Sequence, residues 1–488
     1  MTTIDLTVDT VRRERAVQRA RERNIVIPTF AQMRNPRIMP EKVINDLSRV
    51  GLWDVDARNL FRITWHNQPT ASGGSFGGVN YLELPSSLTG VEARIIVLVG
   101  KWFPTGAHKV GAAFGCLVPR LVTGQFDPTS QKAVWPSTGN FCRGGAYDSA
   151  LLACQSIAIL PEGMSRERFD WLAKIAGEVI ATPGSESNVK EIFDKCWELR
   201  GSGQDLMIFN QFEEFGNYLW HYAVTGAAME ELLQQVMGGR DIYRGMVSAT
   251  GSAGTIASGD YLKQLFPASK IAASEALQCP TLLENGFGSH RIEGIGDKHV
   301  PWIHNVKNTD LVVAIDDEAV VSLARLFNEP AGRAYLVTRG VPTQIVDSLD
   351  LLGFSGISNL LSAIKMAKYY EMDGHDIILT VLTDSMELYA SRLLEMHSLH
   401  GDYTSLDAAA DFARFLQGEA TDAMLELTYA ERRRVHNLKY FTWVEQQGKT
   451  YEEIQAQWYD HDYWTAVQGQ VLEIDQLIEA FNHDVGLL

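Results

Sequence analysis

The stretch Trp102-Phe-Pro-Thr-Gly-Ala-His-Lys-Val-Gly-Ala-Ala-Phe114 decides how the fold is interpreted. It follows Arg94-Ile-Ile-Val-Leu-Val99, whose apolar and β-branched residues predict a buried strand. Lys109 lies between a turn-forming Pro-Thr-Gly and a Gly-Ala-Ala run that is typical of a tightly packed helix. The sequence therefore predicts a strand, a turn and a helix, with one long cation where the turn meets the helix. An ordinary surface lysine is the alternative interpretation of Lys109.

The same alternation of strand and helix continues from about residue 93 to residue 390. Further strands are expected at Ala133–Trp135, Ser156–Leu160, Glu178–Ala181, Leu206–Phe209, Gly245–Ser248, Lys270–Ser274, Leu311–Ile315 and Ile377–Leu382. Helices are expected at Cys142–Gln155, Arg166–Ala176, Ser187–Arg200 and Ile256–Gln264. This alternation predicts an α/β fold with parallel sheets that carry helices on both faces. Ligands of such sheets bind at the carboxyl ends of the strands.

Composition and charge narrow the classes of function. The chain has 488 residues, 45% of them hydrophobic, which is enough for more than one core. Its 43 basic and 60 acidic residues give a formal charge of −17, so we expect neither a nucleic-acid nor a membrane partner. The five cysteines form no CxxC pair, so we expect no disulfide framework and no metal site. The highly charged N-terminus predicts a solvated helix rather than a signal peptide, and hence a cytoplasmic protein.

Three loops that follow expected strands combine small residues with polar groups. The first holds Lys109, the second is Ser137-Thr-Gly-Asn140, and the third is Thr250-Gly-Ser-Ala-Gly-Thr255. The amide groups of a glycine-rich turn and of a helix N-terminus converge readily on a phosphate or a carboxylate. Each loop alone is also explained as an ordinary turn. Together they suit pyridoxal 5′-phosphate, because its aldehyde condenses with a lysine amine to form a Schiff base.

Further motifs extend this set along the chain. In order, the motifs are Pro104-Thr-Gly-Ala-His-Lys109, Ser137-Thr-Gly-Asn140, Asn210-Gln-Phe212 with Asn217, His221-Tyr222 and Thr225-Gly226, Gly251-Ser-Ala-Gly-Thr255, Glu293-Gly-Ile-Gly296 with Pro301, Gly353-Phe-Ser-Gly-Ile-Ser358 and Leu382-Thr-Asp-Ser-Met-Glu-Leu-Tyr389. Between about residues 80 and 392 they resemble the β-family (fold type II) of pyridoxal-phosphate enzymes, in its cysteine synthase and cystathionine β-synthase branch. The resemblance implies a tryptophan synthase β-like fold of two three-layer α/β/α domains.

The resemblance also implies roles for individual residues. Lys109 would hold the cofactor as a Schiff base and later move the substrate's α-proton as general base and acid. The other cofactor-binding residues would be Asn140 at the 3′ oxygen, Gly251, Ser252, Ala253, Gly254 and Thr255 at the phosphate, and Ser385 at the pyridine nitrogen. Substrate binding would use Ser137, Thr138, Gly139, Gln211 and Gly296. Asp384 or Thr383 could equally face the pyridine ring, with Ser385 serving as a helix cap.

The chemistry implied is β-replacement or β-elimination on a small L-amino acid such as serine, O-acetylserine or cysteine, through an aminoacrylate Schiff base. The alternative within enzymes is a pure lyase, such as a cysteine desulfhydrase or an ammonia-lyase. The alternative from another class is a catalytically retired scaffold that binds a partner enzyme. The partner expected for an active enzyme is a small amino-acid substrate, and the resemblance favours a homodimer.

Some positions depart from the family pattern. Val110-Gly111 stands where the branch usually has Asp-Arg after the lysine, and Phe141 replaces the small Thr that usually follows Asn140. A bulkier wall at Phe141 would change which substrate side chains fit. The similarity of Gly-Ala-His-Lys to the tryptophan synthase β subunit is weaker, because that subunit's Gly-Gly-Gly-Ser-Asn phosphate loop is absent. No cysteine precedes Cys116, so we expect no haem.

Two side chains near the motifs have both a chemical and a packing interpretation. His108 could act as an acid, although packing against the cofactor is favoured. Cys142 could be a reactive thiol at a helix start, although a buried small hydrophobe is favoured.

The expected domain organisation follows from the resemblance and the change of pattern at the two ends. Residues 1–70 form an N-terminal extension, residues 71–125 and 230–395 a large pyridoxal-phosphate domain, and residues 126–229 a smaller domain with the substrate loop. Residues 396–488 are rich in helical pattern and aromatics, and we expect them to form a helical cap or a dimer contact.

Overall fold

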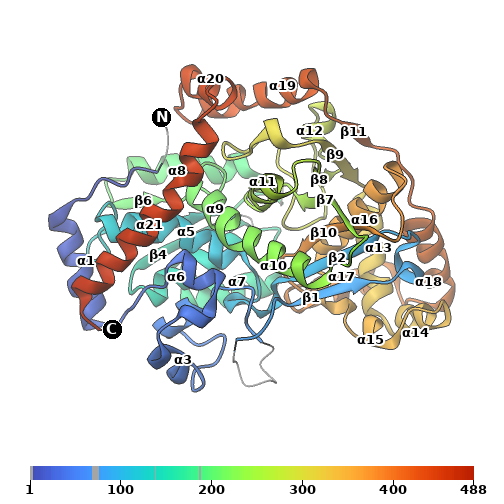
Figure 1. Ribbon diagram of the computed structural model, residues 1–488, viewed down its shortest axis with the longest axis horizontal. Coiled ribbons are helices and arrows are strands. Elements are labelled where there is room, and N and C mark those ends of the chain that lie inside the picture. The colour runs from blue at the N-terminus through green and yellow to red at the C-terminus, as the bar shows by residue number, and fades with distance from the viewer. Residues whose placement is uncertain (1–3, 69–75, 138, 186–187, 488) are drawn as a thin grey trace.

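The computed structural model describes residues 4–68, 76–137, 139–185 and 188–487. Two separate sheets organise this part of the chain. The larger sheet has the strand order β1-β2-β10-β7-β8-β9-β11, and the smaller one β5-β4-β3-β6. Helices surround both sheets, as Figure 1 shows. The α/β fold class predicted from the sequence is confirmed.

The larger sheet is parallel in its centre and antiparallel at its edges. Its strands are β1 (Tyr81–Leu84), β2 (Arg94–Val99), β7 (Ile242–Ala249), β8 (Lys270–Ala276), β9 (Leu311–Ile315), β10 (Asp376–Leu382) and β11 (Met424–Glu426). The central strands are buried along nearly their whole length, which explains their continuous apolar runs. β11 was not predicted; it places a strand in a C-terminal region that was expected to be only helical.

The smaller sheet is entirely parallel. Its strands are β3 (Lys132–Pro136), β4 (Gln155–Pro161), β5 (Glu178–Thr182) and β6 (Leu206–Ile208). All four were predicted, although Phe209 lies just beyond the end of β6. The domain limits and the homodimer stay predictions.

The α-helices lie between and around the strands. They are α1 (Thr10–Glu22), α2 (Phe30–Arg34), α3 (Glu41–Leu47), α4 (Ser86–Thr89), α5 (Lys109–Thr123), α6 (Asn140–Leu151), α7 (Arg166–Ile175), α8 (Val189–Gly201), α9 (Phe215–Trp220), α10 (Gly226–Val236), α11 (Ile256–Leu265), α12 (Thr281–Glu284), α13 (Asp317–Asn328), α14 (Pro330–Thr338), α15 (Thr343–Val346), α16 (Phe354–Tyr369), α17 (Ala390–His400), α18 (Ser405–Asp411), α19 (Tyr429–Asn437), α20 (Tyr451–Tyr459) and α21 (Tyr463–Val485). α6 begins two residues earlier than predicted and ends before Gln155, which belongs to β4.

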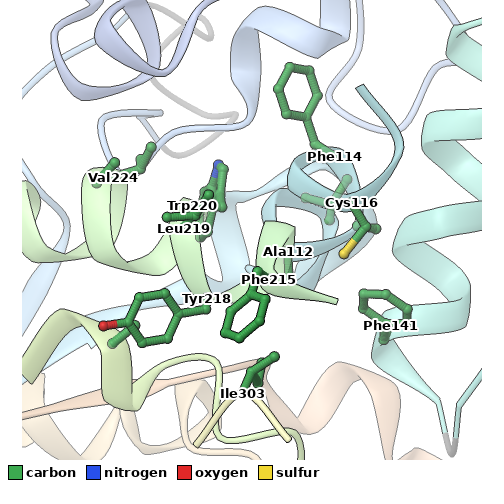
Figure 2. Close-up of a cluster of buried hydrophobic side chains, with 14 of the residues drawn as sticks. Ala112, Phe114, Cys116, Phe141, Phe215, Tyr218, Leu219, Trp220, Val224 and Ile303 are labelled. Carbon is green, nitrogen blue, oxygen red and sulfur yellow. The ribbon is translucent and has the colours of Figure 1, made fainter. Parts of the chain in front are cut away.

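The glycines after Lys109 allow α5 to pack closely against α9. A Cβ at Gly115 would meet the carbonyl oxygen of Gly216, and a Cβ at Gly216 would meet that of Gly115. A Cβ at Gly111 would overlap the Trp220 ring. Figure 2 shows the surrounding cluster of buried side chains, with Trp220 among them. This helix crossing therefore requires glycine at positions 111, 115 and 216.

The two ends of the chain pack against each other, and Figure 1 shows α1 beside the long helix α21. Gln470 exchanges two hydrogen bonds with the backbone of Ile4, at 3.0 and 2.8 Å. Asp475 accepts hydrogen bonds from the first amides of α2. The helix predicted near the N-terminus is present as α1, but it is not wholly solvated, because Ala16, Val17 and Ala20 are buried. Within the described residues, no helix combines the length and apolar character needed to traverse a bilayer.

Candidate active site

Lys109 is the first residue of α5, just beyond the carboxyl end of β2. Its Nζ donates a hydrogen bond to Ser252 Oγ at 2.9 Å and a longer one to Gln211 Oε1 at 3.4 Å. The side chain is partly buried, and the lysine lines one cavity together with the loop from Gly251 to Thr255. Lys109 is therefore not an ordinary surface lysine.

The loop Gly251–Thr255 connects β7 to α11 and forms the floor of this cavity. A Cβ at Gly254 would overlap the carboxamide of Asn217, so only glycine fits there. Ala253 adopts a φ of 60°, the left-handed conformation that glycine usually occupies. Asn217 supports the loop by donating to Ser252 Oγ at 2.9 Å. The loop exposes backbone amides ahead of the helix α11, an arrangement that favours an anion.

The predicted substrate-binding residues lie at the carboxyl end of β3 and beside it. Gln211 Nε2 donates to Ser137 Oγ at 3.1 Å, and Gly139 N donates to the same oxygen at 3.3 Å. Gln211 also accepts from Lys109, so the lysine and this loop share one hydrogen-bonded group. Thr138 lies outside the described residues. Gly296 contributes its amide to Thr250 O at 3.1 Å and so adjoins the glycine-rich loop.

Asn140 is tied to the stretch that follows β10. Its Nδ2 donates to Asp384 Oδ2 at 2.6 Å, and Tyr389 OH donates to the same oxygen at 2.6 Å. Burial raises the pKa of the Asp384 carboxyl. Thr383 lines the cavity of Lys109, whereas Ser385 is buried at the start of a 3₁₀ turn and its side chain makes no capping bond. Asp384 is thus engaged with Asn140, while Thr383 and Ser385 remain candidates for the ring position.

Two buried histidines pack close to the start of α5. His108 Nε2 lies 3.1 Å from Thr383 Oγ1, and its ring contacts His221 edge to face. Burial lowers the pKa of His108 to about 3, and it lowers that of His221 well below its usual value. Both rings are therefore uncharged at neutral pH, and His108 packs rather than acting as an acid. Burial also raises the pKa of the Cys142 thiol to about 12, which makes that cysteine inert.

Asp297 is a residue of this site that the sequence analysis missed. It directly follows Gly296, it is buried, and its Oδ2 has no hydrogen-bond partner among the described residues. Burial raises its pKa to about 7, and the charge of Lys109 acts in the opposite direction. A carboxyl with a pKa near neutrality is suited to proton transfer. An acidic residue immediately after the Glu-Gly-Ile-Gly motif was the available signal.

A buried ion pair connects α7, the helix after β4 of the smaller sheet, to the site. The sequence analysis did not identify this pair. Arg168 Nη1 lies 2.7 Å from Glu293 Oε2, with both side chains almost fully buried. Arg168 Nη2 donates to Tyr389 OH at 2.9 Å. Arg392 holds the other oxygen of Glu293 at 2.6 Å. A Cβ at Gly139 would overlap the Arg168 guanidinium, so this cation lies against the substrate loop.

Comparisons with known proteins match the part of the chain that contains these site residues. A family model described as pyridoxal-phosphate dependent enzyme matches residues 86–335. A cysteine synthase of Staphylococcus aureus is 26% identical over 316 residues, covering 64% of this chain and 93% of the relative.

Two solved structures share the fold of this chain. A hydrogen sulfide-producing enzyme of Fusobacterium nucleatum has a TM-score of 0.56 at 23% identity, covering 71% of this chain and 96% of that one. An O-acetylserine dependent cystathionine β-synthase of Helicobacter pylori has a TM-score of 0.54 at 22% identity, covering 64% and 95%. At such identities the likeness shows the fold alone.

Proposed function

Because the chain belongs to the family of pyridoxal-phosphate-dependent enzymes, we propose that it performs β-replacement or β-elimination on a small L-amino acid. Its cofactor is pyridoxal 5′-phosphate. The observation that carries the proposal is the meeting of three groups at one point. Lys109 donates both to Ser252 of the glycine-rich loop and to Gln211, which in turn donates to Ser137 of the substrate loop.

The described residues fit this cofactor. In the loop Gly251–Thr255, Ala253 adopts a φ of 60°, and such left-handed residues in a turn direct successive backbone amides toward an anion such as a phosphate. Asn140 Oδ1 is buried without a hydrogen-bond partner in the described part of the chain, so it can receive a group of the cofactor ring. The loop amides would hold the phosphate, Asn140 the 3′ oxygen, and Lys109 the aldehyde carbon. Ser385 would face the ring nitrogen, with Thr383 as the alternative.

Once bound, the cofactor withdraws electrons from the substrate's α-carbon and so acidifies the α-proton. The protein's own task is to position and move that proton. Lys109 Nζ, released from the cofactor when substrate binds, would take the α-proton, with Ser252 and Gln211 holding the amine in place. Ser137 and the amides at the N-terminus of α6 would bind the substrate carboxylate, which the helix dipole stabilises.

Product analysis tests this proposal and separates replacement from elimination. The holoenzyme is incubated with L-serine, L-cysteine and O-acetyl-L-serine, each with and without sulfide. We expect a sulfide-dependent amino-acid product from at least one of them, because the substrate loop retains the carboxylate-binding pattern. Pyruvate as the sole product regardless of the nucleophile would leave only the lyase. No turnover of any of the three, in protein that binds the cofactor, would contradict the proposal.

Asp297 favours the lyase as the second candidate function. A buried carboxylate next to Gly296 in the chain, with an oxygen that lacks a hydrogen-bond partner in the described part of the chain, can accept a proton from water during product release. The carboxyl ionises as the pH rises through about 7. In the lyase, kcat for pyruvate release should therefore rise between about pH 6 and pH 8 and then level off.

Replacing Asp297 with asparagine tests this role. Asp297→Asn should remove the rising limb and slow pyruvate release by about 10²-fold, because asparagine cannot take up a proton. Asp402→Asn, at a side chain that is 92% exposed, is the control and should keep the wild-type profile. The variant also has a readout besides activity. Because burial raises the pKa of folded Asp297, its ionisation lowers wild-type stability as the pH rises from about 4 to 7, and Asp297→Asn should lose this decline. A variant that retains the rising limb would contradict the assignment.

A further inference from the structure

Arg143 is a buried cation for which the described residues supply no acidic partner in an ion pair. It lies on α6 and is 2% exposed, and its Nε and Nη1 have no hydrogen-bond partner among the described residues. The guanidinium carbon lies 4.8 Å from the Trp171 ring centroid and 5.8 Å from that of Trp53. The guanidinium thus packs against two indoles, while its Nε and Nη1 find no acceptor in the part of the chain that the structure describes. A buried donor without an acceptor is costly, and a charged one more so.

Other buried cations of the protein differ from Arg143 because their charged groups have hydrogen-bond partners. Arg168 has Glu293 and Tyr389. Lys439 donates to two backbone carbonyls and to Gln457. Burial and the charge of Arg168 lower the pKa of Arg143 to about 10, which still leaves it protonated at neutral pH. A protonated, buried guanidinium whose Nε and Nη1 have no acceptor among the described residues is a suitable partner for an anionic group of a ligand.

The position of Arg143 connects it to the substrate loop. It lies one helical turn beyond Gly139 and Asn140, on the same side of α6 as these residues. The carboxyl of Asp384, which holds Asn140, acts on the Arg143 charge. The next residue, Gly144, packs against the backbone at the start of α5, where a Cβ would lie 3.0 Å from Lys109 O. Arg143 therefore lies in the first turn of α6, next in the chain to the residue that packs against the start of α5.

Trp53, in the N-terminal segment, packs near Arg143 and near the turn before Lys109. A Cβ at Gly106, in the turn before Lys109, would lie 2.9 Å from the Trp53 ring. Trp53 and Trp171 also pack edge to face with centroids 6.4 Å apart. Residue 53 precedes the part of the chain that the family model matches. The N-terminal segment thus contributes an aromatic wall that orients Arg143 and limits its access to water.

We propose that Arg143 binds a second anionic group of the substrate, a carboxylate or a phosphate ester attached at Cβ. This inference rests on the proposed function, which assigns the α-carboxylate to Ser137 and the amides of α6. The donors of Arg168 are engaged with Glu293 and Tyr389, whereas Arg143 has two N–H donors without a partner among the described residues and can take a second anion. In elimination from a phosphate ester, the Cβ–O bond breaks and its electron pair leaves with the phosphate. The α-proton goes to Lys109. Arg143 would stabilise the charge on that phosphate.

Matched pairs of ligands test the inference on the holoenzyme by titration calorimetry. L-aspartate and L-asparagine have nearly the same shape and differ in charge. O-phospho-L-serine and O-acetyl-L-serine extend the test to a phosphate. We expect at least one anionic member to bind about tenfold more tightly than its neutral counterpart, as a charge-assisted hydrogen bond in a buried site allows. The pair with the larger ratio identifies which anion the site takes. Equal affinities within both pairs would overturn the inference without any variant.

Variants test whether Arg143 is the residue responsible for the preference for anionic ligands. Arg143→Gln should abolish the ratio between anionic and neutral ligands, and Arg143→Lys should retain part of it. Arg166→Gln, at an exposed arginine on α7, is the control and should keep the wild-type ratio. A purely structural role would lower the thermal stability of Arg143→Gln and leave the ratio unchanged, which would overturn the inference. If the neutral ligands bind and the anionic ones bind no more tightly, the role of Arg143 is refuted and the proposed function is not. Absence of binding by any L-amino acid would refute the proposed function and this inference together.

Discussion

Lys109→Ala is expected to lower turnover by at least about 10³-fold, because it removes both the amine that holds the cofactor covalently and the group that moves the α-proton. The variant should still fold, since the Lys109 side chain is partly buried at the first position of α5 and alanine favours a helix. Borohydride reduction followed by mass spectrometry measures the covalent attachment directly. In the wild type, the modified peptide should contain residue 109.

Lys101→Ala is the matched control for this prediction. Lys101 lies in the same segment after β2, where its amine is 3.6 Å from Asp350 and 3.8 Å from Glu387. These are ion pairs with exposed carboxylates, so their loss should change stability by less than about 1 kcal/mol and leave the covalent attachment intact. A reduced cofactor found on another lysine in the wild type would remove the basis of the proposed mechanism. Full activity of Lys109→Ala would do the same.

Much of the fold could be predicted from the sequence because its strands are buried on both faces. Continuous apolar runs such as those of β2 and β10 are recognisable without knowledge of their neighbours. β11 could not be recognised, because three residues carry no periodic pattern and the strand exists through its pairing with β9. The packing of the chain ends was equally hidden. The bonds between Gln470 and Ile4 join residues 466 positions apart, and no local pattern encodes such a pairing.

The residues of the candidate site also fall into two groups, those in local sequence motifs and those brought together only by tertiary packing. Lys109, Gln211 and the glycine-rich loop stand in contiguous motifs, so the sequence alone brings them to attention. Arg143 and Arg168 are single charged residues on two expected helices, outside any motif that the sequence analysis singled out. Only tertiary packing shows that both guanidinium groups are buried, that of Arg168 beside Gly139 and that of Arg143 against Trp171 and Trp53. Charged residues are rarely buried without a reason, and this is information that the three-dimensional structure adds.

Arg168→Met is expected to lower the free energy of unfolding by about 3 kcal/mol, since it leaves the buried Glu293 carboxylate with one partner fewer. Arg392 still neutralises Glu293 at 2.6 Å, which is why we expect the lower end of the usual loss for a broken buried pair. The substitution also removes the donor to Tyr389 and the cation beside Gly139, so the Michaelis constant for the amino-acid substrate should rise. Urea unfolding of the holoenzyme, followed by tryptophan fluorescence, measures the stability.

Arg166→Met supplies the comparison, because it makes the same chemical change two residues away on α7. Arg166 pairs with Asp170 at 3.6 Å, but both side chains are largely exposed, 84% and 65%. Water and salt screen this pair, so its loss should cost less than about 1 kcal/mol. The difference between the two variants therefore isolates the effect of burial from that of losing an arginine. Equal stabilities for Arg168→Met and Arg166→Met would mean that the Arg168–Glu293 pair does not hold α7 against the site.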